Sequence, residues 1–414
     1  MRDGGAVRPP GATTGPGLAG TDPQSYGVRF GARATQPVDS ACVQHSRNRD
    51  LDGVRGLAVL LVVAAHAGLP VRWGGLSGVT LFFVLSGYLI TSLLVREHDR
   101  YGAISLWRFW GRRALRLLPA LLLLLAAVPV LLALTDPGHL AAYPWQALAS
   151  LLYVGNYVRI AGHDLGVLNH LWSLSVEEQF YVVWPTVFVV VVTWFRARAL
   201  SIVLALAGGA TFYSVWTKGA AIRLDVATET NAFALLLGAS LALALAELGR
   251  REIALPHASP LFPFLVLVAL SAFPGHSMEV DHELFRPLGA VFAVVALWLV
   301  YAAVSGHARL VGSRFMVFFG TISYAFYLWH QALINSRLLG AHTLGRNLVL
   351  VAVAVVVAWL SWVLVERPTG RLRSRLRLDE PSGRQAAALA ARAQAQAQAT
   401  AGTGMRSAAP AASP

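Results

Sequence analysis

Two ionisable residues enclose an apolar stretch in the first hydrophobic segment of the chain. Arg55 and His66 are separated by ten residues that are all apolar or glycine. On an α-helix, eleven steps of ~100° bring both side chains close to one face, ~16 Å apart along the axis. Ionisable groups at membrane depth usually mark a functional path, and histidine suits proton transfer near neutral pH. His66 is therefore a candidate catalytic base; the alternative is a surface-reaching arginine and a histidine hydrogen-bonded to a neighbouring helix.

An arginine cluster stands at the start of the third hydrophobic segment, in the sequence RFWGRRALRLLP. Arg112, Arg113 and Arg116 have the spacing i, i+1 and i+4, which predicts one shared helix face. Guanidinium groups bind phosphate oxygens through paired hydrogen bonds, so these residues and Arg55 are candidate phosphate ligands. The alternative is that they mark the cytoplasmic side of a membrane and contact anionic lipid headgroups.

The sequence WSLSVEEQFY (172–181) combines two carboxylates with aromatic side chains. Glu177 and Glu178 are adjacent and point in different directions on a helix, so one of them can face the interior. We expect this segment at the outer mouth of the fourth membrane helix, with Glu177 as a partner of a catalytic group or a ligand for an acceptor hydroxyl. The alternative is a carboxylate that stabilises a helix N-terminus. Trp172 and Tyr181 either line an acceptor site or anchor the helix at the membrane interface.

Polar side chains recur every three residues in the ninth hydrophobic segment, as Tyr324, Tyr327 and His330. Measured from the inner ends of their segments, His330 reaches a depth of ~22 Å and His66 a depth of ~20 Å. The matched depths predict that the two histidines meet in one polar cavity in the outer half of the membrane. The alternative is a belt of aromatic and histidine side chains at the outer interface.

The composition indicates what kind of fold positions these residues. Of 414 residues, 56% are hydrophobic and 13% are charged, about half the charged fraction of a soluble domain. Apolar runs of membrane-spanning length recur, which predicts an all-α, multi-pass protein of the plasma membrane with about ten transmembrane helices. We expect these at 53–70, 77–95, 115–134, 176–195, 199–216, 229–248, 259–273, 287–304, 315–337 and 344–366.

The placement of charge sets the expected orientation. Ten spans put most of the 34 arginine and lysine residues on one side of the membrane, which predicts that both termini are cytoplasmic. An eleventh span within 140–175 would reverse every later loop, so we predict that this segment is re-entrant or interfacial. Because the charge of +13 follows membrane side, we expect the lipid bilayer and no nucleic acid as a partner. Residues 1–50 are predicted to be a disordered cytoplasmic tail, 51–368 the transmembrane domain, and 369–414 a low-complexity cytoplasmic tail.

Five motifs together resemble the acyltransferase-3 family of integral membrane O-acyltransferases. They are LDGVRGLAVLLVVAAH (51–66), GVTLFFVLSGYLITSLL (78–94), RFWGRRALRLLPALLLL (108–124), HLWSLSVEEQFYVVWP (170–185) and TISYAFYLWHQALI (321–334). They occur in the order of the family and cover essentially all of 51–368. One departure is Thr80, which stands where the family motif often has an aspartate, and it puts any role of that carboxylate in doubt.

The resemblance implies an enzyme that transfers acyl groups other than amino-acyl groups, with ten membrane helices. Family members move an acyl group, often acetyl from cytoplasmic acyl-CoA, to a hydroxyl of a sugar or similar acceptor. The resemblance therefore implies acyl-CoA, here acetyl-CoA, as the donor, bound through its phosphates by Arg55, Arg112, Arg113 and Arg116. His66 is the expected general base, with Glu177 or Tyr327 orienting it or stabilising charge. Trp172, Tyr181, Tyr324 and His330 are the expected acceptor-binding residues, and no metal is predicted.

Several alternatives stay open from the sequence. The acceptor is a carbohydrate of the cell envelope or an exported glycan, or instead a secondary metabolite such as a macrolide. The acyl group passes directly to the acceptor, or through an acyl-histidine intermediate. A transporter is the alternative from another class, for which Gly- or Pro-broken spans and inverted repeats would be typical. Pro119 and Pro129 interrupt the third segment, but no repeat is visible.

Overall fold

The computed structural model describes residues 48–217, 221–273, 282–305, 310–376, 378, 380–391 and 393–394. Within these ranges the chain is helical or irregular and contains no strand. Most of the predicted N-terminal tail, up to residue 47, and the end of the predicted C-terminal tail, beyond residue 394, lie outside the described residues.

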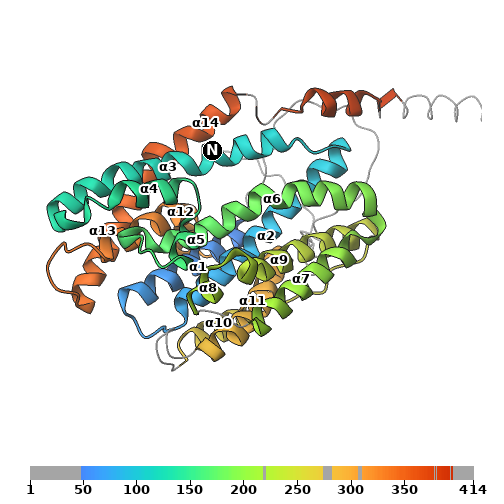
Figure 1. Cartoon of the computed structure of the whole chain (residues 1–414). Coiled ribbons are helices and arrows are strands. Elements are labelled where there is room, and N and C mark those ends of the chain that lie inside the picture. The colour runs from blue at the N-terminus through green and yellow to red at the C-terminus, as the bar shows by residue number, and fades with distance from the viewer. Residues whose placement is uncertain are drawn as a thin grey trace, which may run out of the picture. The chain divides into compact units, whose positions relative to one another are not determined.

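Each predicted apolar segment coincides with a helix (Figure 1). These helices are α1 (Arg49–Ala67), α2 (Gly74–Tyr101), α3 (Leu106–Thr135), α6 (Trp172–Phe195), α7 (Ala199–Trp216), α9 (Thr228–Arg250), α10 (Leu261–Ser271), α11 (His282–Val304), α12 (Arg314–Ile334) and α13 (Leu344–Ser361). A π-helical turn (Trp362–Glu366) joins α13 to α14 (Arg367–Arg375), and α8 (Ala221–Val226) precedes α9. The helix α3 continues through both of its prolines.

Six helical stretches of the described chain are long and apolar enough to cross a membrane. They are 74–101, 106–135, 166–216, 228–250, 287–304 and 344–372. Large apolar side chains are exposed on these helices, with Leu134 and Trp194 each 77% accessible. Exposed large apolar side chains on helices of spanning length are suited to lipid rather than water. The protein is therefore a multi-pass membrane protein whose described elements are all helical.

The segment between α3 and α6 forms only short helices. These are η1 (Pro137–His139), α4 (Tyr143–Leu151), α5 (Gly155–Ile160) and η2 (Gly166–Leu171). At ~1.5 Å per residue, the 9 residues of α4 extend ~13 Å, which is less than half of a bilayer core. The Tyr143 hydroxyl donates to the Leu125 carbonyl of α3, and Gln179 of α6 donates to the Tyr153 carbonyl. The segment thus folds back against two long helices, as a re-entrant or interfacial interpretation requires.

Small residues let α1 and α12 approach closely. A methyl group added at Gly320 of α12 would overlap the Asp52 carbonyl, and one at Gly56 of α1 would overlap the Met316 carbonyl. Such close backbone contact is typical of helix packing in membranes, where no hydrophobic effect drives helices together. Because α1 and α12 run in parallel, the same contact brings His66 and His330 to one level.

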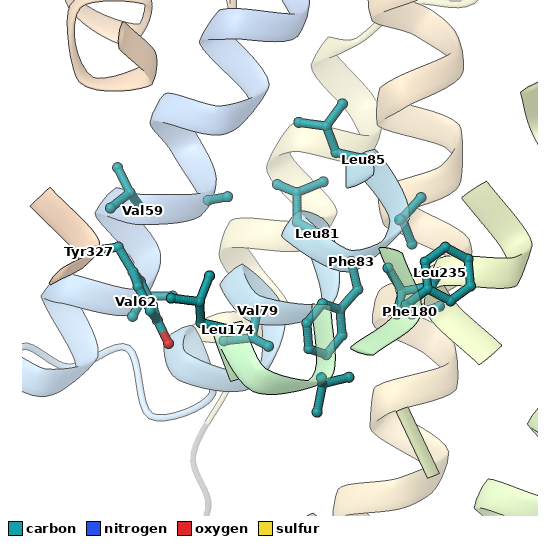
Figure 2. Packing of buried hydrophobic residues seen from close by; sticks show 14 of the residues in the cluster. Val59, Val62, Val79, Leu81, Phe83, Leu85, Leu174, Phe180, Leu235 and Tyr327 are labelled. Atoms are coloured by element: carbon teal, nitrogen blue, oxygen red, sulfur yellow. The ribbon is translucent and has the colours of Figure 1, made fainter. Parts of the chain in front are cut away.

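Apolar side chains from several helices pack beside α1 and α12. Figure 2 shows Val59 and Val62 of α1, Tyr327 of α12 and Leu174 of α6 within one cluster. The helix α1 begins at Asn48, whose side chain accepts from the Asp50 and Leu51 amides, and it ends at the left-handed Gly68 (φ 86°). His66 therefore lies in the last turn of a helix that is fixed at both ends.

Candidate active site

Three histidine rings gather where α1, α12 and η2 meet. His66 Nδ1 lies 3.0 Å from the Val62 carbonyl and 3.3 Å from His330 Nε2. His330 Nδ1 lies 2.7 Å from the Tyr327 carbonyl. His330 is 0% exposed, whereas His66 is exposed. The predicted meeting of the two histidines at one depth is thus present in the structure.

The hydrogen-bond partners select one tautomer for each of these rings. A carbonyl oxygen only accepts, so His330 Nδ1 carries a proton and its Nε2 presents a lone pair. Val62 fixes the proton of His66 on Nδ1 in the same way, and that N–H is shared with His330 Nε2. The lone pair of His66 Nε2 is then free to accept a proton. This is the logic of a base oriented by a second group that also stabilises its charged form.

His170 is the third histidine, and it was not among the predicted site residues. It is 3% exposed, and its ring centroid lies 5.2 Å from that of His330 and 5.4 Å from that of Tyr327. His170 Nε2 donates to the Leu328 carbonyl (3.1 Å), and the His170 carbonyl accepts from the Tyr327 hydroxyl (2.7 Å). Ser173 lies 2.5 Å from the same hydroxyl. The start of α6 is thereby locked to α12 beside the His66–His330 pair.

A second polar cluster surrounds Glu177. The hydroxyls of Ser86 and Tyr181 both donate to Glu177 Oε1. The Arg113 guanidinium lies 3.8 Å from Glu177 and 3.1 Å from Glu178, and it stacks 3.2 Å above the Tyr181 ring. Of the three charged residues in this cluster, Glu177 is the most accessible, with 20% of its side chain exposed. Two carboxylates around one guanidinium leave this cluster with a formal charge of −1.

The predicted position of Glu177 at the outer mouth of its helix was wrong. Its partner Ser86 lies in the middle of α2, and its partner Arg113 lies two turns into α3. The reason is that the folded-back segment before α6 delivers the first turn of that helix into the bundle rather than to its rim.

A spacing in the sequence identifies most of these interior residues. His170, Ser173, Glu177 and Tyr181 follow one another at intervals of three and four residues, which is the repeat of one helix face. Each of these four residues contributes a hydrogen bond to one of the two polar clusters. This periodicity was the available signal for His170.

Two further arginines, Arg55 and Arg116, come from the first halves of α1 and α3. Arg55 and Arg116 are near enough for their charges to repel, and Glu366 is the nearby opposite charge. Within the described residues, neither guanidinium makes a hydrogen bond or ion pair, and Glu366 Oε1 is buried without a partner. Arg116 is exposed and Arg55 is half-buried. A net positive, unsatisfied pair of this kind is suited to bind an anion.

The expectation that Arg112 shares a face with Arg113 and Arg116 was wrong. Arg112 instead donates to the Leu378 carbonyl (2.8 Å) and pairs with Glu97 (3.1 Å). Consecutive helix positions differ by ~100°, so Arg112 and Arg113 reach different neighbours. The segment that contacts Arg112 belongs to the predicted low-complexity tail, of which residues 383–391 are helical.

The remaining candidates occupy the edges of these clusters. Tyr324 is half-buried and donates to the Leu117 carbonyl at 2.9 Å. Trp172 is half-buried against the apolar core, and Tyr181 is buried. Their roles in acceptor binding stay predictions. Among the described residues, no group of three histidine, cysteine, aspartate or glutamate side chains is arranged to hold a metal ion.

Comparison with known proteins identifies the family of this chain. A family model for an acyltransferase domain, acyltransferase-3, matches residues 48–366. The chain is 29% identical over 348 residues to peptidoglycan O-acetyltransferase OatA of Listeria monocytogenes, with 77% of this chain and 55% of that protein covered. It is 33% identical over 347 residues to the putative peptidoglycan O-acetyltransferase YrhL of Bacillus subtilis, covering 77% of this chain and 54% of YrhL.

A third relative is O-acetyltransferase OatA of Staphylococcus aureus, 31% identical over 304 residues, which covers 69% of this chain and 50% of that protein. The chain thus matches about half the length of the curated relatives. No solved structure matches it. Because the family model matches well over half of the sequence, the chain belongs to the acyltransferase-3 family.

Proposed function

We propose that this protein is a membrane O-acetyltransferase that moves an acetyl group from acetyl-CoA to a hydroxyl of a cell-envelope glycan. One observation carries the proposal: His66 presents an unoccupied Nε2 lone pair while its Nδ1–H is held by Val62 and His330. The named activities of the relatives support an acetyl group and a glycan acceptor.

The donor is proposed to bind through its phosphates to Arg55 and Arg116. Of the four arginines predicted to bind phosphate, these two make no hydrogen bond or ion pair within the described residues, whereas Arg112 and Arg113 hold protein partners. Arg55 and His66 stand ~16 Å apart on α1, a span that an extended pantetheine arm can bridge. A donor whose phosphates bind to these arginines can therefore place its thioester at the histidines.

The orientation in the membrane belongs to the same proposal. With ten crossings and both termini in the cytoplasm, the arginines face the side that supplies acyl-CoA. The histidines then lie in the outer half, where an envelope glycan is accessible.

The reaction follows from the geometry at His66. As the acceptor oxygen attacks the thioester carbonyl carbon, His66 Nε2 takes the hydroxyl proton. The imidazolium that forms is stabilised by His330 Nε2 and the Val62 carbonyl, which both accept from Nδ1–H. The carbon–sulfur bond of the tetrahedral intermediate then breaks, and His66 returns its proton to the departing thiolate. The products are an acetyl ester and free coenzyme A.

The test is acetyl transfer by the purified chain in lipid vesicles. Radiolabelled acetyl-CoA and a muropeptide-derived oligosaccharide are supplied, and ester-linked label in the glycan is measured. His66→Ala is expected to lower the rate by ~10²–10⁴-fold, the usual contribution of a general base. His163→Ala is the matched control, because His163 is exposed and contacts only Trp145 among the ring contacts of the described chain. Full activity of a folded His66→Ala protein would refute the assignment.

A further inference from the structure

Tyr153 has a backbone conformation that a bulky residue rarely adopts. It joins α4 to α5 with φ at 53°, in the left-handed region. This conformation costs free energy for a side chain with a Cβ, and it persists only where the surroundings enforce it. Here the Tyr153 amide donates to the Ser150 carbonyl at 3.2 Å, and its carbonyl accepts from Gln179 at 2.7 Å. Gln179 follows the Glu177–Glu178 pair directly, so the strained turn is fixed to α6 beside that cluster.

The strained turn directs the phenol toward the polar interior. The phenol lies within electrostatic range of Glu178, Arg113 and Glu177, and also of Tyr324 of α12. The side chain is half-buried, and within the described residues its hydroxyl makes no hydrogen bond. Burial raises the pKa of the Tyr153 phenol and Glu178 raises it further, so the hydroxyl keeps its proton near neutral pH. It is therefore a hydrogen-bond donor without an acceptor in the protein.

The position of Tyr153 matches the middle of the donor path. Tyr324 of α12 donates to the Leu117 carbonyl, next to Arg116 in the sequence. Gln179, which holds the Tyr153 carbonyl, follows Glu178, and Glu178 pairs with Arg113, one turn before Arg116 on α3. One turn further along α12, Tyr327 joins the histidine cluster. A donor that runs from the arginines to His66 presents its uncharged amide groups at this level, because its phosphates remain bound to the arginines.

We propose that the Tyr153 hydroxyl donates a hydrogen bond to an amide carbonyl of the donor's pantetheine arm. Tyr153 then contributes to donor binding and selects donors that carry this arm. This inference rests on the proposed function, because it assumes a coenzyme A thioester as donor. The strain is explained as the cost of holding an unpartnered hydroxyl in place before substrate arrives.

The experiment compares three donors with the full chain in lipid vesicles. Acetyl-CoA and acetyl-pantetheine both carry the two amides of the arm, whereas 4-nitrophenyl acetate carries none. Tyr153→Phe removes the hydroxyl and keeps the ring. We expect it to raise KM for both thioesters about five- to tenfold, the effect of one hydrogen bond, with kcat unchanged. The rate with 4-nitrophenyl acetate should stay at the wild-type value.

Tyr157→Phe is the matched control, because the Tyr157 hydroxyl donates to Glu229 (3.1 Å) at an exposed position four residues away. Wild-type KM for thioesters in Tyr153→Phe, or an equal loss with 4-nitrophenyl acetate, would overturn the inference. A wild-type protein that transfers nothing from acetyl-CoA would instead overturn the proposed function, and the inference with it. The two failures are distinguished by the wild-type measurement alone.

Discussion

Replacing His330 by phenylalanine tests whether His66 is tuned by its neighbour. The variant keeps a flat ring in a site that is 0% exposed and removes the acceptor for the His66 Nδ1–H. A hydrogen bond to a charged partner contributes about 1.5–3 kcal/mol. The distance of 3.3 Å is at the long end of the range, and the Val62 carbonyl at 3.0 Å remains as a second acceptor. The lower limit of about 1.5 kcal/mol therefore applies, which predicts a roughly tenfold lower kcat.

The assay is kcat for acetyl transfer in vesicles, measured for both single variants and the double variant. In a His66→Ala background, His330→Phe should cause no further loss, because His330 acts only through His66. A further tenfold loss in that background would show that His330 acts independently, and it would refute the reasoning. Thermal unfolding of each purified variant checks that the rates refer to folded protein.

Three other changes probe the donor site and its supports. Arg116→Gln should raise KM for acetyl-CoA about tenfold or more, and leave that for 4-nitrophenyl acetate unchanged, because a phosphate contact is lost; equal effects on both donors would contradict it. Arg346→Met should lower the free energy of unfolding by about 3 kcal/mol, since this residue is 7% exposed and donates to several carbonyls at the end of α12; unchanged thermal unfolding would argue against that. Gly320→Leu should prevent folding, because its side chain would overlap the Asp52 carbonyl; a normal yield of monodisperse, active protein would exclude that packing.

The parts of the site that the sequence predicted well depend only on helix geometry. His66 and His330 were expected at one depth because helix rise per residue is nearly constant. Their meeting also needed α1 and α12 to be neighbours, which the pair of Gly56 and Gly320 makes possible. The helices themselves were predictable because lipid requires every backbone group to be satisfied within its own helix.

The parts that were missed depend on where the chain turns back. The depth of Glu177 is set by the folded segment before α6, and no periodicity within α6 contains that information. Arg112 was predicted to bind the phosphates of the donor. In the structure its guanidinium donates to the Leu378 carbonyl, a backbone atom distant in sequence. Such a partner leaves no trace in side-chain spacing. Tyr153 was part of a segment judged by the charge placement of the later loops, while its strain appears only in the backbone angles.

The order of charged groups along the helix bundle affects how far the proposed donor can enter. Arg55 and Arg116 with Glu366 carry a formal charge of +1, and Arg113 with Glu177 and Glu178 carries −1. A polyanionic nucleotide is attracted by the first group and repelled by the second, and both effects are strong where water is scarce. Only the uncharged arm of the proposed donor then advances past the carboxylates toward the histidines. Charge, rather than a narrow passage alone, would thus fix how far the donor enters and leave the thioester at His66.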